Sequence, residues 1–117
     1  MLDEDIRSVI DDMVRNGPKW KPNKLVAHLE KRKRQEQIPP DWTAEDYNNW
    51  IIRIVTDGST EIYRYWLPHF QKSYLVFGLP KWIVIVGEDG IMETAFEIDR
   101  QSYYEYLNPR AGFLRVK

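Results

Sequence analysis

Residues 81–99, KWIVIVGEDGIMETAFEID, contain two predicted strands joined by a turn, and this stretch decides the fold class. Apolar residues occupy both faces of 81–87, which is typical of an internal strand that is covered on both sides. Residues 88–90, Glu-Asp-Gly, are of the types that form tight turns. Alternation over 91–98 indicates a second strand. We therefore expect an antiparallel hairpin within a larger sheet.

Thr94 is the anomaly in this hairpin, because alternation places it on one apolar face with Met92, Phe96 and Ile98. A buried hydroxyl costs about 1 to 3 kcal/mol unless it is hydrogen bonded. In one interpretation, Thr94 bonds to a neighbouring backbone carbonyl and packs through its methyl group. In the other, this part of the face is not sealed and opens onto a cleft floored by the sheet. The residues alone leave both interpretations open.

The rest of the chain is divided by turn residues and by a change of period. Residues 4–15, 23–35 and 44–56 have apolar residues at helical spacing, and the period changes to two from residue 60. Strands are expected at 60–67 and 72–77, ahead of the hairpin strands at 81–87 and 91–98. A short helix is expected at 101–107, and 111–117 is expected either to add an edge strand or to fray. The fold class is therefore α+β, with N-terminal helices packed on a C-terminal four- to five-stranded antiparallel sheet.

Three local signals set the helix boundaries. Asn16-Gly17-Pro18 ends the first helix. Asn23 is expected to cap the second helix, whose Lys31–Arg34 run is expected along its exposed side and end. Residues 43–46 resemble a capping box at the start of the third helix, with Asp in the place of the usual Glu or Gln.

Length and composition bound the function. The 117 residues fit one domain, 1–117, in which about 1–19 form a helix and linker. There is no Cys and no apolar run near the roughly 20 residues that cross a bilayer, so neither a disulfide framework nor membrane insertion is expected. The net charge of -1 argues against a nucleic-acid binder with a basic surface throughout. Seven Lys and Arg residues within 19–34 form the only basic cluster in the sequence that is large enough to bind a nucleic-acid backbone.

His28 and His69 are the only histidines. Lys31 and Arg32 follow His28 at i+3 and i+4, so the three side chains lie on adjoining parts of one helical surface. A proton-transfer imidazole with a lowered pKa is one interpretation, and a partly exposed histidine beside a solvated basic face is the other. His69 follows Pro68 in a loop and needs no functional explanation. The spacing of histidines and carboxylates fits no metal motif, so no metal and no cofactor are expected.

Several of these residues together resemble a known family. The matching pattern is a helix with a histidine, a T-x-E-D-Y-x-x-x-I-I-R-x-V helix, strands like EIYRYW and YLVFG, and WIVIVGEDGIMETAFEID before a Y-x-x-Y-L segment. Over about residues 20–107 this order is similar to the barnase-EndoU-colicin-RelE-like toxin nucleases, closest to the phage and contact-dependent-inhibition type. The matching residues of the late hairpin and following segment are Trp82, Val84, Ile85, Val86, Asp89, Gly90, Thr94, Ala95, Phe96, Tyr103, Tyr106 and Leu107.

The resemblance implies a metal-independent endoribonuclease toxin that acts on RNA, commonly tRNA, with 20–117 as the nuclease core. It implies that His28 is the helix histidine and Thr94 the strand threonine of the catalytic site, with Lys31 or Arg32 as its cation. Related sequences often have a second histidine just after the first, where this chain has Lys31 and Arg32. The expected RNA-binding residues are Lys24, Arg64, Tyr65, Lys81 and Tyr104.

Two other functions fit the sequence. The near-neutral charge, the acidic first helix and the scarcity of histidine favour a non-catalytic immunity protein, antitoxin or phage accessory protein. A RelE-like nuclease would cut messenger RNA only on ribosomes. If the chain is a toxin, we expect it to act in the cytoplasm and to be delivered or secreted as part of a larger toxin. A cognate immunity protein or antitoxin with an acidic surface is then expected to neutralise it.

Overall fold

The computed structural model describes residues 3–117, with the side chains of residues 70, 100 and 101 left out of the description. Three helices come first: α1 (Glu4–Asn16), α2 (Lys24–Arg34) and α3 (Ala44–Thr56). Five strands and one more helix follow: β1 (Glu61–Leu67), β2 (Lys72–Leu79), β3 (Trp82–Gly87), β4 (Met92–Glu97), α4 (Arg100–Tyr106) and β5 (Phe113–Arg115). The α+β class is confirmed, with the N-terminal helices preceding an antiparallel sheet.

The third helix begins as its sequence predicts, and the second does not. Thr43 accepts a hydrogen bond from the Asp46 N–H, and the Asp46 carboxylate accepts from the Thr43 N–H, which completes a capping box. Asn23 precedes α2 in a left-handed conformation, with φ of 69°, and its side chain makes no capping bond. The predicted Asn23 cap is therefore wrong, because the side chain of a left-handed residue does not point at the next turn's N–H groups.

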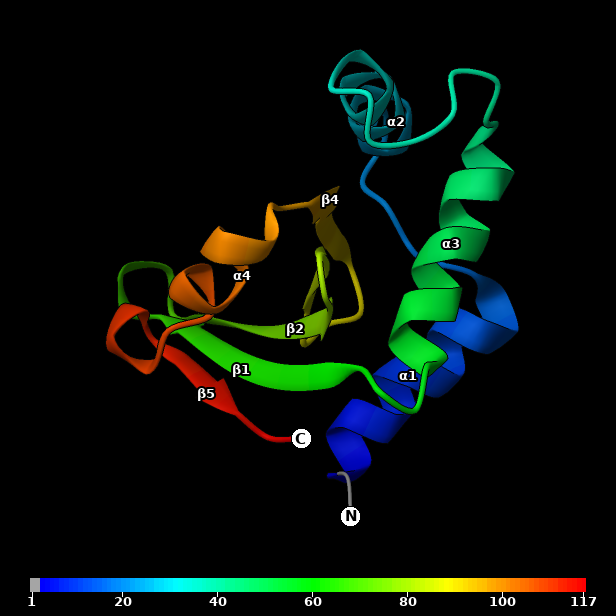
Figure 1. Cartoon of the computed structure of the whole chain (residues 1–117). Coiled ribbons are helices and arrows are strands. Elements are labelled where there is room, and N and C mark those ends of the chain that lie inside the picture. Colours follow the sequence, from blue (N-terminus) through cyan, green and yellow to red (C-terminus); the bar gives the residue numbers. More distant parts are fainter. Residues whose placement is uncertain (1–2) are drawn as a thin grey trace.

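The sheet is a meander extended by one strand. Its order is β4-β3-β2-β1-β5, and every neighbouring pair is antiparallel. The C-terminal segment adds an edge strand against β1 rather than fraying, with Tyr65 opposite Phe113. In Figure 1, α1 and α3 lie on one side of the sheet and α4 lies on the other.

The two faces of the sheet belong to two separate apolar clusters. One cluster joins β1–β4 to α1, α2 and α3 and includes Ile6, Ile51, Phe77 and Val84. The other lies beneath α4 and includes Tyr63, Val76, Ile83, Tyr103, Leu107 and Phe113. Strand β3 contributes to both, as its apolar pattern predicts. We call these the helix face and the α4 face.

A β-bulge in β4 changes which residues share a face. Val86 pairs with Met92 and Ile85 pairs with Thr94, so Glu93 is an extra residue on the β4 side. Met92 packs into the cluster of the helix face, while Thr94 pairs with Ile85 on the α4 face. The expectation that Met92 and Thr94 share a face is therefore wrong, since strict alternation cannot predict an inserted residue.

The outer edge of β4 is covered by other parts of the chain. An open strand edge offers unpaired N–H and C=O groups, which invite pairing with another chain. The covering bonds run from the Met92 N–H to the Lys19 carbonyl (2.7 Å), from the Tyr47 hydroxyl to the Ala95 carbonyl (2.6 Å), and between both backbone groups of Glu97 and the Gln37 side-chain amide (2.9 and 3.1 Å). These bonds hold α3 and the end of α2 beside Thr94. Within residues 3–117, the structure contains no helix that is long and apolar enough to cross a membrane.

Candidate functional site

His28 on α2 and Thr94 on β4 meet at the covered edge of the sheet. Nδ1 of His28 lies 3.3 Å from Oγ1 of Thr94, across 66 positions of sequence. Both side chains are partly exposed, so a ligand can reach them. The sequence raised the possibility of this pairing only through the family resemblance, and the structure brings the two side chains together.

Arg32 completes the cluster one turn further along α2. Its Nη2 donates to Oγ1 of Thr94 at 3.3 Å and its Nη1 donates to Oε1 of Gln35 at 2.6 Å. Its Cζ lies 5.7 Å from the centroid of the Phe96 ring. Arg32 is only 5 % exposed, so the expectation that the whole Lys31–Arg34 run lies on the exposed side is wrong for this residue.

The buried guanidinium of Arg32 has no carboxylate partner. None of the ion pairs among the described residues includes it, and its Nε is buried without a hydrogen-bond partner. Removing a charge from water is costly unless an opposite charge and hydrogen bonds compensate for the loss. An uncompensated cation of this kind makes the electrostatic potential around Thr94 positive, which favours an anion there.

The pKa of His28 is lowered from its ordinary value of 6.5. Burial is the largest cause, because it disfavours the charged imidazolium, and the positive charges of Arg32, Lys31 and Lys24 act in the same direction. The Glu93 carboxylate opposes them. His28 is therefore mostly neutral at physiological pH and able to accept a proton.

Trp20 packs against the imidazole of His28. Its ring centroid lies 5.3 Å from that of His28, and its Nε1 donates to Oδ1 of Asn48 on α3 at 2.9 Å. The indole is thus fixed by α3 and in turn limits the movement of His28.

Lys31 and Lys24 are exposed on α2, near enough to influence His28. Lys31 does not share the hydrogen bonds of Arg32 with Thr94. Of the two cations that the sequence offered, Arg32 is therefore the one in direct contact with Thr94, and Lys31 lies at the solvent side.

The other predicted RNA-binding residues are dispersed. Arg64 lies on the helix face and binds the carboxylates of Asp3 and Glu88, so the structure does not bring it to His28. Lys81 is exposed in the turn between β2 and β3.

Tyr65 and Tyr104 both lie on the side of the sheet that carries α4. Tyr65 stacks on Phe113, with ring centroids 4.4 Å apart, and the Tyr104 hydroxyl donates to Oε2 of Glu61 at 3.0 Å. Tyr65 thus shares the α4 face with Thr94, while Tyr104 is tied to the β1 end.

Residue-by-residue interpretation missed Glu93, Gln35 and Tyr47. Alternation put Glu93 on the face opposite Thr94, whereas in the structure Glu93 is the exposed extra residue of the bulge, directly before Thr94. The buried Tyr47 hydroxyl donates to the carbonyl of Ala95, the residue after Thr94; burial raises the pKa of this hydroxyl, and the nearby charge of Arg32 opposes that rise. Of these three residues, only Gln35 could have been linked to the site from the sequence, because it lies at i+3 from Arg32 and side chains at this spacing are neighbours on a helix.

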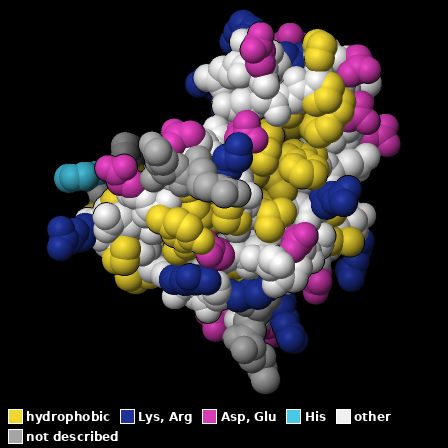
Figure 2. All heavy atoms as spheres, in the orientation of Figure 1, with side chains coloured by type: hydrophobic (Ala, Val, Ile, Leu, Met, Phe, Trp, Pro, Cys, Tyr) yellow, Lys and Arg dark blue, Asp and Glu magenta, His cyan; other side chains and the backbone are white. Residues whose placement is uncertain are grey.

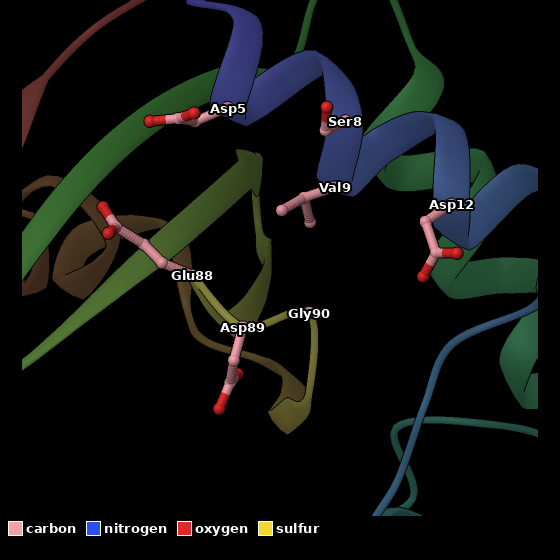
Figure 3. Close-up of a pocket in the computed structure, with 7 residues that line it drawn as sticks. All are labelled: Asp5, Ser8, Val9, Asp12, Glu88, Asp89 and Gly90. Carbon is pink, nitrogen blue, oxygen red and sulfur yellow. The ribbon is translucent and has the colours of Figure 1, made fainter.

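A hollow lies between α1 and the turn that joins β3 to β4, and the charged side chains that line it are acidic, unlike most of those around His28. Figure 3 shows side chains of α1 facing this turn across the hollow. Its lining residues are Asp5, Ser8, Val9, Asp12, Glu88, Asp89 and Gly90. Four carboxylates make it unsuitable for a phosphate group. Within residues 3–117, no group of three or more His, Cys, Asp or Glu side chains is arranged to hold a metal ion.

Comparison with protein families, with curated proteins and with solved structures finds no match to this chain. The resemblance to toxin nucleases therefore stays a prediction, and the site is argued from its own geometry.

Proposed function

We propose that the chain is a metal-independent endoribonuclease that cleaves RNA, with tRNA as the first substrate to test. The observation that carries this proposal is the buried Arg32 guanidinium, which lacks a carboxylate partner and donates to Thr94 at 3.3 Å, beside a His28 that is itself 3.3 Å from Thr94. Next to one another, an imidazole can transfer protons, and a cation and a hydroxyl group can stabilise the charge that develops on a phosphoryl group.

In the proposed reaction, the ribose 2'-hydroxyl oxygen attacks the adjacent phosphorus and the bond from phosphorus to the 5'-oxygen breaks. The products are a 2',3'-cyclic phosphate and a new 5'-hydroxyl. One proton leaves the 2'-hydroxyl and one is added to the departing 5'-oxygen, so the proton count balances. Neutral His28 takes the first proton, and the imidazolium that results can supply the second, directly or through water.

Thr94 would donate its hydroxyl hydrogen to a phosphoryl oxygen. Because Oγ1 already accepts from Arg32, its own hydrogen is left for His28 in the ligand-free protein and for phosphate when RNA is bound. Arg32 acts through Thr94 and through its positive charge. Lys24 and Lys31, at the solvent side, suit contacts with flanking phosphates.

The test is cleavage of purified total tRNA in the presence of a chelator. We expect His28→Ala and Thr94→Ala to lower the rate about 10²-fold or more, because proton transfer and charge stabilisation each contribute on this scale. His69→Ala is the matched control, since it removes the other, exposed histidine and should leave the rate unchanged. Absence of any discrete product, or equal rates for wild type and His28→Ala, would refute the proposal.

A non-catalytic immunity protein or antitoxin is the second candidate, favoured by the mixed surface charge. On the face in Figure 2, basic and acidic side chains are interspersed and hydrophobic side chains gather near the centre. Expression in bacteria separates the two functions. A nuclease should arrest growth unless a neutralising partner is coexpressed, whereas an immunity protein should be harmless and should rescue cells from its toxin. A ribosome-dependent nuclease would cut messenger RNA on ribosomes and leave free tRNA intact.

A further inference from the structure

A small cavity opens on the α4 face next to the candidate site. Its volume is about 140 Å³, and it is lined by Tyr65, Leu67, Tyr74, Ile85, Glu93, Tyr106 and Phe113. Drug-sized ligands occupy pockets of about 300 to 1,000 Å³, so this cavity suits one small planar group. Its walls are mostly aromatic, and Glu93 is the only charged side chain among the lining residues.

The cavity and the candidate site are direct neighbours. Ile85 in the cavity wall pairs with Thr94 across β3 and β4, and paired strands lie about 5 Å apart. Glu93 precedes Thr94, and the bulge lets Glu93 line the cavity on the α4 face. A phosphate group at Thr94 would therefore place its own nucleoside at the cavity.

A continuous path of rings also joins the two places. Tyr106 contacts the Phe96 ring edge to face at 5.8 Å, and Phe96 lies under the Arg32 guanidinium. Tyr106 also contacts Phe113 at 5.4 Å. Aromatic walls of this kind stack an unpaired base, and they do so without regard to its identity.

We infer that this cavity binds the base of the nucleotide whose phosphate lies at Thr94, and that the base is cytosine. This inference rests on the proposed function and adds a base preference to it. The small volume favours a single-ring pyrimidine over a purine. The Glu93 carboxylate only accepts hydrogen bonds, and the exocyclic amino group of cytosine donates them, whereas uracil presents a carbonyl oxygen at that position.

Calorimetric titration with cytidine 3'-monophosphate and uridine 3'-monophosphate tests the inference, because each compound carries one base and the phosphate beside it. Wild type should bind the cytidine compound about 10-fold more tightly, as expected for one base-specific contact. In Glu93→Gln the ratio of the two affinities should fall to about one, because the amide can donate to uracil as well as accept from cytosine. Glu93 also affects the charge of His28, and this effect changes the binding of both compounds equally. The ratio of the two affinities therefore reports only the contact with the base.

Glu105→Gln is the matched control, since it removes an exposed carboxylate of α4 outside the cavity and should keep the wild-type ratio. Equal affinities in wild type, binding of neither compound, or a ratio that Glu93→Gln leaves unchanged would overturn the inference. If tRNA is cleaved but the cytidine compound is not preferred, only the base preference fails. If the cytidine compound is preferred but no RNA is cleaved, cytosine binding in the cavity is supported and the proposed nuclease function is refuted.

Discussion

Two arginines at opposite sides of the sheet have opposite surroundings. Arg64 on the helix face is 28 % exposed and binds both Asp3 and Glu88, and Glu88 lines the acidic hollow in Figure 3. Arg32 is 5 % exposed and binds the neutral oxygens of Gln35 and Thr94. The charge of Arg64 is thus neutralised within the protein, and that of Arg32 is not.

The difference is that only Arg32 keeps a positive charge that no carboxylate of the described residues neutralises. A paired, partly exposed arginine changes the free energy of unfolding only slightly, because solvent screens the ion pair. A buried cation without an anion destabilises the folded state, because the lost hydration of the charge is not replaced. The two arginines can therefore be compared by making the same substitution at each.

The largest expected difference between the two arginines is in RNA cleavage. Arg32→Met should lower the rate about 10²-fold or more, because it removes the donor to Thr94 and the positive charge behind it. Arg64→Met, an equal change on the other side of the sheet, should leave the rate within about twofold. Initial rates on purified tRNA measure both. Similar losses in the two variants would show that Arg32 has no special place in the reaction.

For Arg32→Met, the free energy of unfolding should change in the opposite direction to the cleavage rate. Replacing Arg32 with Met removes an uncompensated buried charge, so the free energy of unfolding should stay equal or rise by about 1 to 4 kcal/mol. Arg64→Met should lower it by about 0 to 1 kcal/mol, the usual range for an exposed ion pair. Urea unfolding followed by tryptophan fluorescence gives both values. A strongly destabilised Arg32→Met protein would mean that the guanidinium is a structural element after all.

The smallest expected effect is on the titration of His28. Lys31→Gln should raise the pKa of His28, because it removes a positive charge, and Glu93→Gln should lower it. NMR spectra of the imidazole protons follow both shifts, and the His69→Ala background leaves a single histidine. Shifts of the same sign in the two variants would contradict the described surroundings of His28.

The lowered pKa of His28 also sets the expected pH dependence. Cleavage should decline as the pH falls through that pKa, below 6.5, because the imidazole must be neutral to accept a proton. In the unfolded chain His28 titrates near 6.5, so below this pH the unfolded state binds the proton first and the folded state loses stability. This loss should be smaller in His28→Ala.

Much of the fold could be predicted from the sequence because its signals are local. Helical spacing, the Thr43–Asp46 capping box and the change to a period of two define α1, α3 and the meander strands. The left-handed Asn23 and the inserted Glu93 could not be predicted, because each depends on backbone conformation set by packing. Proximity of His28 to Thr94 was expected only from the family resemblance.

The burial of Arg32 is the feature of the site that local pattern misrepresented. In KRKR all four residues look equivalent, yet the turn of α2 that faces β4 buries one of them against Thr94 and Phe96. The cavity beside it combines residues from β1, β2, β3, β4, α4 and β5, so no single segment contains its pattern.

We propose that His28, Thr94 and Arg32 form a site for RNA cleavage by the 2'-hydroxyl group. The most direct measurement is the chemistry of the chain ends after incubation of purified tRNA with the protein and a chelator. We expect discrete fragments that end in a 2',3'-cyclic phosphate and begin with a 5'-hydroxyl, formed by wild type and not by His28→Ala. Intact tRNA, or fragments that end in a 3'-hydroxyl, would contradict it.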